Sequence, residues 1–495
     1  MPAGGTSRTF RSPYVLVALF ILLLPAITSR LNASDEIEYF AWLRSWAFDR
    51  DADFTNEYQH FYDAGPVHNE GFYDTFLAQK NENGRPNNFT PIGTAILWAP
   101  FYAVGHLWAT LGGGGDEGYG PPYIQLVALA SACYGLLALL LSCAVAARVL
   151  GTHALIPALV VWFGTPLIFY MYVAPGFGHA CSAFSVALFL WTWVRVRDRW
   201  TWAGAFQLGA AGALLPMVRE QDAFFLAGPA IDFVRWTLRQ RGSGITSANP
   251  VARPPAERSW RAPIAAAIAG LVACVLVYAP QLAAYQALNG HPGPATVVAR
   301  KMSWSSPHFF GVILSPEHGF FVWTPLAVLA IAGLVRLVAR GATSDREAGE
   351  GPIVSDPRWV GTLGLLMVLL QFYISGSVES WTVAGSFGQR RMIALTPLVV
   401  LGLAALMQGW RHRAGLRAGL AISLVIATWW NLGLMAQFGL HTMDRQRLTL
   451  RENAQQTFIE LPRSLPSVVW RYLFHRDSFY GLPASPPSAA AGRPD

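Results

Sequence analysis

Two adjacent carboxylates, Asp35 and Glu36, follow the first apolar segment of the chain and lie within a few residues of a membrane surface. An acid in that place can exchange a proton with a bound hydroxyl group, so the pair is a candidate for acid–base chemistry. In the alternative interpretation, Ser34 caps a surface helix, because negative charge in the first turn stabilises a helix N-terminus. Aromatic residues follow, as in a helix of the headgroup layer, and the local sequence leaves both interpretations open.

Three arginines stand at the external ends of apolar segments: Arg219, Arg390 and Arg391. Arginine on that side departs from the positive-inside pattern, and a charge near hydrocarbon is costly unless it is paired or hydrated. Gly385 and Gly388 precede two of these arginines and would let the backbone approach a ligand closely. Because guanidinium groups match phosphate oxygens in bidentate geometry, we favour a phosphate site. The structural alternatives for Arg219 are pairing with Glu220 or Asp222, or extension of its side chain to the interface. The alternative for Arg390 and Arg391 is a contact with lipid phosphates.

His179 follows a Pro-Gly turn at an external helix end and would face the same site. A histidine at a helix start is, however, more often a structural hydrogen-bonding residue. The chain has no histidine or cysteine cluster with zinc spacing, no phosphate-binding P-loop and no dinucleotide fingerprint. The sequence therefore indicates neither a resident metal nor a nucleotide cofactor.

The composition indicates a membrane protein. Of the 495 residues, 53% are apolar and only 13% are charged, which is about half the charged share of a soluble protein. The formal net charge is +7, but the arginines cluster between apolar segments, as topology signals do, so we do not infer a nucleic-acid partner. We predict an all-α polytopic membrane protein.

The first 31 residues are predicted to be a cytoplasmic N-terminus and an uncleaved first transmembrane helix over residues 13–31. Residues 32–120 are rich in acids and are predicted to form a long external loop with juxtamembrane helices. Within this loop, the apolar stretch at residues 91–111 is short and contains Pro100. We interpret that stretch as interfacial or re-entrant rather than spanning.

The transmembrane core is predicted at residues 121–440, and residues 441–495 are predicted to be an external tail with a disordered end. Further spans are expected at residues 122–147, 153–173, 179–194, 201–218, 223–238, 263–286, 319–338, 359–376, 392–409 and 418–438. With the first helix these make about eleven spans, and arginine-rich loops recur on one side. This topology predicts a multi-pass protein of the inner (plasma) membrane whose acid pair faces the external, periplasmic side.

The acidic pair in this topological place resembles that of the membrane-integral C-type (GT-C) glycosyltransferases, the superfamily of the protein O-mannosyltransferases and the lipid A aminoarabinose transferase. Looser similarities lie at residues 88–93, 98–101, 165–167, 219–220, 315–321 and 381–391. They cover most of the membrane core and are similar to an uncharacterised bacterial subfamily. One departure is the short segment after the last span, where many relatives carry a sizeable soluble domain.

The resemblance implies an inverting transfer of a hexose or pentose from a polyprenyl-phosphate donor to an acceptor on the external face. In such enzymes one carboxylate removes the acceptor proton, and cations hold the leaving phosphate. Asp35 is the expected base and Glu36 would orient the acceptor, although the two roles could be exchanged. Arg219, Arg390 and Arg391 would bind the donor phosphate. No divalent metal is expected, since relatives with monophosphate donors generally do not require one.

The resemblance also suggests substrate contacts. Trp381 would stack on the sugar or the prenyl chain, Glu57 and Tyr58 would help to bind the acceptor, and His179 and Glu220 are weaker candidates. The expected partners are the lipid-linked sugar donor, membrane lipids, and a lipid, glycan or protein acceptor. Neither the sugar nor the acceptor follows from the sequence.

Three competing functions are weighed against the transferase. A transporter or lipid flippase would place charges along a path through the bilayer, whereas the span interiors here contain almost none. An O-antigen polymerase or ligase usually has its large loop late in the chain, whereas here it comes first. A purely structural membrane protein would not require acids and arginines together on the external side.

Overall fold

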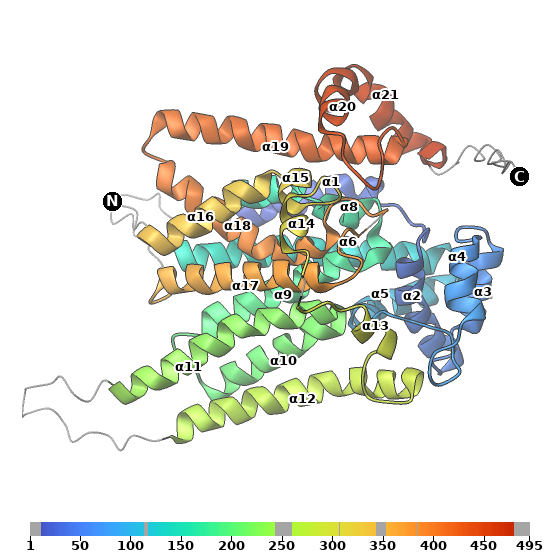
Figure 1. The fold of residues 1–495 in the computed structure, drawn as a ribbon, viewed down its shortest axis with the longest axis horizontal. Helices are drawn as coiled ribbons and strands as arrows, with labels where there is room; N and C mark the ends of the chain where they lie inside the picture. Colours follow the sequence, from blue (N-terminus) through green and yellow to red (C-terminus); the bar gives the residue numbers. More distant parts are fainter. Residues whose placement is uncertain are drawn as a thin grey trace, which may run out of the picture.

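A computed structural model describes residues 11–112, 117–242, 260–305, 307–342, 353–383 and 385–479. Regular structure in these ranges is helical, apart from two isolated β-bridges. The long helices lie side by side as one bundle (Figure 1). The all-α prediction is therefore confirmed. Residues 1–10, most of the basic loop at residues 243–259 and the expected disordered end of the tail lie outside the described residues.

In the part of the chain that the structure describes, the bundle is built from ten helices and one interrupted helix. The ten are α1 (Arg11–Leu23), α6 (Pro121–Leu150), α9 (His179–Val196), α10 (Trp202–Val218), α11 (Ala227–Gly242), α12 (Arg261–Asn289), α16 (Leu326–Arg340), α17 (Pro357–Ser377), α18 (Thr396–Trp410) and α19 (Ala414–Leu440). Within the described ranges, six helical stretches are long and apolar enough to cross a membrane, namely α6, α9, α12, α17, α19 and the stretch Arg390–Trp410. The helical membrane class is supported, and the count of eleven spans stays a prediction.

The interrupted helix is the expected span at residues 153–173. It is divided into α7 (Leu155–Gly164) and α8 (Leu167–Tyr172), because Pro166 has no backbone N–H with which to continue the helical ladder. The Thr165 hydroxyl donates to the Val161 carbonyl over 2.7 Å and accepts from the Leu167 N–H over 3.3 Å. The side chain thus satisfies polar groups that the break would leave unpaired.

Glycines let pairs of bundle helices pack closely. A Cβ atom on Gly333 of α16 would lie 1.8 Å from the carbonyl oxygen of Gly402 of α18. Likewise, a Cβ atom on Gly209 of α10 would lie 2.0 Å from the carbonyl oxygen of Gly270 of α12. Small residues at such crossings are typical of helices that associate in membranes, where van der Waals packing is a main contribution to association.

The acid-rich segment 32–120 gathers at one end of the bundle, opposite the end where α16 and α18 finish (Figure 1). It contains α2 (Ser34–Arg44), η2 (Ser45–Asp49), α3 (Thr55–Asp63), α4 (Glu70–Phe72), η3 (Tyr73–Ala78) and α5 (Gly93–Leu111). Buried aromatic side chains of these elements, including Phe40, Trp42 and Tyr58, form one core cluster with residues of α6, α9, α10 and α12.

Helix α5 covers the apolar stretch whose spanning character the sequence leaves open. It runs antiparallel to the first half of α6: Gly105 packs against Pro122, and the Trp98 indole donates to the Ser131 hydroxyl over 2.9 Å. The Tyr134 hydroxyl, farther along α6, donates to the Leu97 carbonyl over 2.8 Å. These contacts lie along residues 122–134 of α6, and the interfacial or re-entrant placement of α5 stays a prediction.

The remaining elements connect the bundle helices or follow the last one. The connecting elements are η1 (Leu24–Ala26), η4 (Pro175–Phe177), η5 (Glu220–Leu226), α13 (Thr296–Arg300), α14 (Phe309–Leu314), α15 (Phe320–Trp323) and η6 (Arg390–Leu395). After α19 come α20 (Leu450–Gln455), η7 (Gln456–Glu460), α21 (Leu461–Phe474) and η8 (Arg476–Phe479). The segment predicted as an external tail thus begins with α20, η7 and α21, which follow one another without a turn and fold back on α19 as a helical hairpin.

Candidate functional site

The two acids of the pair, Asp35 and Glu36, point in different directions at the start of α2. Glu36 turns back and accepts hydrogen bonds from the backbone N–H groups of Asn32 (2.7 Å) and Ala33 (3.1 Å). Ala33 is the residue before the helix, so Ser34 is not the cap that the sequence suggested. Glu36 is 2% exposed, and its backbone contacts give it a capping role in the described structure.

Burial raises the pKa of Glu36 from 4.5 to about 7, and the backbone donors at Asn32 and Ala33 oppose this shift. Between pH 4.5 and 7 the folded state therefore binds more protons than the unfolded state, and stability falls as the pH rises. We expect Glu36→Gln to remove this part of the dependence, so that from pH 5 to pH 8 the variant loses about 3 kcal/mol less stability than the unaltered chain.

Thermal unfolding in detergent at several pH values measures this difference. Asp63→Asn is a matched control, because this exposed acid of α3 bonds only the side chain of Gln59 (2.8 Å). It should leave the pH slope unchanged. Equal slopes for Glu36→Gln and the unaltered chain would show that Glu36 does not titrate with folding.

Asp35 points the other way and meets the arginines. One carboxylate oxygen, Oδ2, lies 2.7 Å from Nη1 of Arg390, and the two side chains are 38% and 19% exposed. Arg390 begins η6, and its guanidinium lies over the Phe177 ring at 5.3 Å. The carboxylate of Asp35 and the guanidinium of Arg390, which are far apart in the sequence, therefore form an ion pair. The Asp35 side of this pair is open to solvent.

Arg219 contacts this region from the end of α10. Its guanidinium donates to the ring of His179, which is buried at the first position of α9 between the rings of Phe177 and Tyr170. The imidazole accepts this hydrogen bond, so it is in its neutral form. The structure thus brings His179, which was expected to face the same site, into contact with Arg219, and the histidine holds the arginine in place.

The acids that follow Arg219 have other partners. Glu220 accepts a hydrogen bond from the hydroxyl of Tyr285 on α12, and Asp222 accepts one from Ser182 over 2.6 Å. Burial raises the pKa of Asp222 from 3.8 to about 7, against the opposing charge of Arg219. Within the described ranges, no carboxylate lies within 4.0 Å of the Arg219 guanidinium, so the expected pairing with Glu220 is not found.

Arg391 has only neutral partners among the described residues. It is 9% exposed and donates to the Ser375 carbonyl at 3.4 Å and to the Ser380 hydroxyl at 3.1 Å. Asp35 is thus paired with Arg390, and the charges of Arg219, Arg390 and Asp35 all lie within reach of the buried Arg391 guanidinium.

Sequence reasoning missed Glu38 and Tyr39, which are buried beside these residues. Glu38 accepts from the Phe89 backbone N–H at 2.6 Å, and burial, followed by the charge of Asp35, raises its pKa well above 4.5. Burial also raises the pKa of Tyr39, which lies within reach of the charges of Arg219 and Arg390. The spacing of the acids could have predicted Glu38 as a site residue, because residues three apart share a helix face and Glu38 follows Asp35 by three.

Trp381 lies on the loop that also provides a partner for Arg391. Its ring stacks on His308 at 5.2 Å, and its carbonyl accepts from the Gln389 side chain at 3.2 Å. Backbone hydrogen bonds join this loop to the preceding external one, from Ser303 to Ser377 (2.6 Å) and from Glu379 to Lys301 (2.8 Å). The segments between the expected spans, at residues 287–318 and 377–391, are the predicted external loops. These hydrogen bonds join them into one unit beside Arg391.

The glycines before Arg390 have a structural reason that the sequence did not show. Gly388 has φ +62°, and a Cβ atom there would lie 2.7 Å from Cγ of Pro166. Gly385 also has positive φ, +75°, with open space around its Cα. The proposed close approach of a ligand is therefore not needed to explain Gly388, because packing against Pro166 already requires a glycine.

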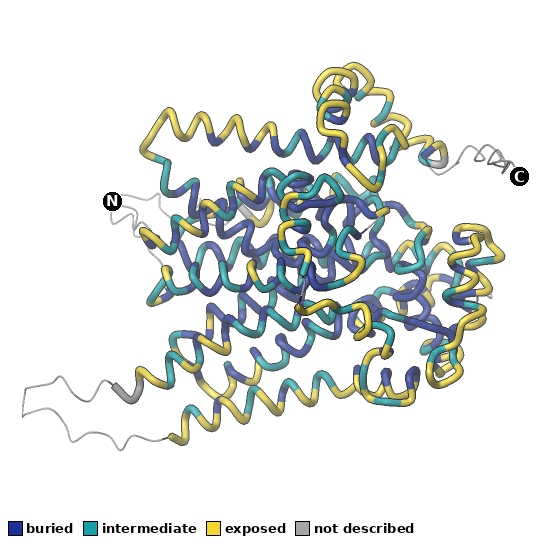
Figure 2. Tube along the Cα trace, in the orientation of Figure 1, coloured by how far each residue is buried: buried dark blue, intermediate teal, exposed yellow. Residues whose placement is uncertain are grey.

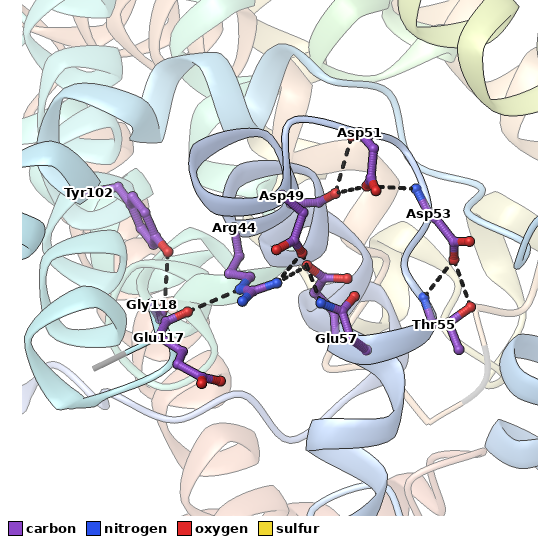
Figure 3. Close-up of polar contacts among 11 residues, drawn as sticks. Arg44, Asp49, Asp51, Asp53, Thr55, Glu57, Tyr102, Glu117 and Gly118 are labelled. Atoms are coloured by element: carbon purple, nitrogen blue, oxygen red, sulfur yellow. Dashed lines mark hydrogen bonds and ion pairs between the residues drawn. The ribbon is translucent and has the colours of Figure 1, made fainter. Parts of the chain in front are cut away.

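Glu57 lies in a separate network at the other end of α2 (Figure 3). The Glu57 side chain is fully buried and pairs with Arg44 at 3.0 Å, and Arg44 also pairs with Asp49. The Tyr58 hydroxyl donates to the Asn87 carbonyl at 2.9 Å. Both predicted acceptor-binding residues thus hold the external segment together, and neither lies open to a substrate in this structure.

We expect Glu57→Gln to destabilise the fold by about 2 kcal/mol, because it weakens a buried charge pair while Asp49 still compensates Arg44. The measurement is the thermal unfolding midpoint in detergent. The matched control is Glu70→Gln, an exposed acid of the same external segment, which should change stability by less than about 0.5 kcal/mol. Equal midpoints for the two variants would contradict a supporting role for Glu57.

The described residues contain no group of three or more metal-ligating side chains. No protein-family model matches the chain, and no curated protein matches its sequence. The arrangement of Asp35, Arg219, Arg390 and Arg391 must therefore be interpreted from its own chemistry. It offers one carboxylate that can accept a proton and several cations that can hold an anion.

Proposed function

We propose that this protein is an inverting glycosyltransferase that moves a sugar from a polyprenyl-phosphate donor to an acceptor at the external face of the membrane. The observation that carries the proposal is the Asp35–Arg390 ion pair of 2.7 Å within a cluster that also holds Arg219 and Arg391. The cluster joins a candidate base to an excess of guanidinium groups at the acid-rich end of a helical membrane bundle.

The donor phosphate would occupy the space beside the three arginines. Arg391 and Arg219 have no carboxylate partner among the described residues, so a phosphate can bind them without displacing an acid. Arg390 can then share its guanidinium between the phosphate and Asp35, since it offers five N–H donors. With the phosphate on the arginines, the acceptor hydroxyl must arrive on the opposite face of the anomeric carbon, and Asp35 would have to reach the hydroxyl there.

The transfer is a displacement at the anomeric carbon. Asp35 accepts the proton of the acceptor hydroxyl, and the hydroxyl oxygen forms the new bond to that carbon. The bond between the carbon and the phosphate oxygen breaks, and its electron pair stays on the lipid phosphate, whose growing charge the arginines stabilise. Because bond formation and bond breaking occur on opposite faces, the configuration at the carbon is inverted.

Other residues would position these groups. His179 holds Arg219, Ser380 holds Arg391, and Trp381 lies on the loop that carries Ser380. Glu36 is turned into the backbone, which favours Asp35 as the base of the pair. The sidedness follows from the predicted topology, in which the arginine-rich loops are cytoplasmic.

The direct test is transfer by the purified full chain in lipid nanodiscs. It is incubated with radiolabelled polyprenyl-phosphate sugars and with lipid, glycan and protein acceptor fractions of the cell envelope. Formation of a labelled product that needs the donor supports the proposal, and the product identifies the acceptor. If several donors give no product while vesicles containing the protein move a labelled polyprenyl phosphate between leaflets, the protein is a flippase instead.

A further inference from the structure

The segment after the last long helix folds back along that helix. The Trp429 indole of α19 donates to the Thr457 carbonyl at 3.0 Å. A Cβ atom on Gly433 would lie 2.4 Å from Cγ2 of Thr457, so glycine is what allows this approach. Gly433 precedes the end of α19 by seven residues, and the tip of the returning hairpin therefore lies about 10 Å back from that end.

Buried polar contacts fix the hairpin to α19. The Gln437 amide donates to the Thr457 hydroxyl at 2.7 Å, and the Asn453 amide donates to the Gln437 side-chain oxygen at 2.8 Å. Asn453 and Thr457 are both buried. Paired amides in the interior define one docking geometry, because shifting the hairpin would leave them unsatisfied.

The far end of the hairpin is fixed to the first helix. The Tyr472 hydroxyl donates to the Ala26 carbonyl at 2.9 Å, and the Arg476 guanidinium donates to the carbonyls of Pro25 and Ile27 at 2.6 Å each. The hairpin thus bridges α19 and the end of α1. It lies beside the bundle at the level of the last turns of α19 (Figure 1).

Much of the hairpin is exposed (Figure 2), and its exposed side chains include charged residues, such as Arg451, Glu452 and Arg471, as well as a set of apolar ones. Exposed apolar side chains recur from its tip to the end of α21: Phe458 44%, Ile459 53%, Val469 47%, Trp470 58%, Leu473 41% and Phe474 62%. Farther along α19, Ile422, Val425 and Ile426 are also exposed, on a helix apolar enough to face lipid. The apolar surface of the hairpin therefore continues that of a membrane span.

Polar groups border this surface where α21 ends. A polar cavity of about 600 Å³ separates the end of α21 from the loop that follows α1. Its lining residues are Thr28, Ser29, Arg30, Leu473, Phe474, His475, Arg476 and Ser478. Basic side chains beside exposed aromatic ones are typical of elements that lie at the headgroup level of a bilayer. Glu460 and Arg463 near the tip have long stems that can extend toward water.

We propose that the α20–α21 hairpin is an interfacial membrane element whose apolar face lies in the bilayer and contacts lipid acyl chains. Two observations carry this, the continuity of its apolar surface with α19 and its position about 10 Å back from the end of that helix. The proposal does not depend on the transferase activity.

The test measures the environment of single positions in the full chain. Ile459→Cys and Leu473→Cys replace exposed apolar residues, and Ser467→Cys is the matched control on the polar side of α21. Each variant carries a nitroxide label in nanodiscs of phosphatidylcholine and phosphatidylglycerol. The label's accessibility to oxygen, which concentrates in acyl chains, is compared with its accessibility to a water-soluble nickel chelate. The unaltered chain, whose four cysteines lie in α6, α9 and α12, gives the labelling background.

We expect the ratio of oxygen to nickel accessibility to be several-fold higher at positions 459 and 473 than at position 467. Equal and high nickel accessibility at all three positions would place the hairpin in water and overturn the proposal. Low accessibility to both reagents at 459 and 473 would also overturn it, because the surface would then be covered by protein, such as a second copy of the chain.

Discussion

Asp35→Asn is expected to lower kcat for sugar transfer by about 10³-fold, which corresponds to about 4 kcal/mol of transition-state stabilisation. Asparagine keeps the shape of the side chain and can still accept a hydrogen bond from Arg390, but it cannot take up the acceptor proton. Because the ion-pair partner stays in place, donor binding should change much less than kcat. The measurement is initial-rate transfer from labelled polyprenyl-phosphate sugar in nanodiscs.

Two matched variants separate catalysis from folding. Glu36→Gln alters the neighbouring acid, which bonds backbone N–H groups, and it should keep most of the activity. Asp63→Asn alters an exposed acid of the external segment and should keep all of it. If Glu36→Gln removes activity while Asp35→Asn retains it, the roles of the pair are exchanged. If both variants retain activity, neither residue is the base.

Arg390→Ala is expected to lower kcat/KM by about 10²-fold, with most of the loss in donor affinity, because one guanidinium leaves the phosphate site. Arg390→Lys should recover only part of the loss, since an ammonium keeps the charge but not the planar fork. A second readout is inhibition by polyprenyl phosphate, the released product. Its inhibition constant should rise by a similar factor, whereas a residue that acts only in folding would leave that constant unchanged in the folded fraction.

The ion pair also predicts how the double variant behaves. Since Asp35 and Arg390 are in contact, the losses in Asp35→Asn/Arg390→Ala should be far from additive, and the double variant should resemble Asp35→Asn alone. Arg300→Ala is the matched control, an exposed arginine of α13 that should leave the rate and the inhibition constant unchanged. Additive losses would show that the two side chains act at separate places.

The composition and the position of charges predicted the class of the protein and the residues worth testing. Long apolar segments predicted the helical membrane bundle, and external arginines together with Asp35 predicted an anion site. These features are local, because the length of an apolar run and the sign of a flanking charge can be determined without knowing what packs against them.

The interruption at Pro166 shows the limit of that reasoning. An apolar run of about 20 residues predicts a span, but the proline turns it into two helices whose break then receives Gly388 from a loop more than 200 residues away. Hydrophobicity alone does not detect this, since α7 and α8 are both apolar. The proline is visible in the sequence, but its contact with Gly388 depends on the tertiary structure.

What the sequence by itself determined was the membrane class, the acids at the start of α2, and the set of arginines near one membrane face. The tertiary structure decided that Asp35 meets Arg390, that Glu36 turns into its own backbone, and that Glu57 is a buried partner of Arg44. The reason is physical: neighbouring residues on a helix point about 100° apart, so adjacent acids can face different surroundings. Which surroundings each one meets depends on how distant helices pack, and a single stretch of sequence does not contain that information.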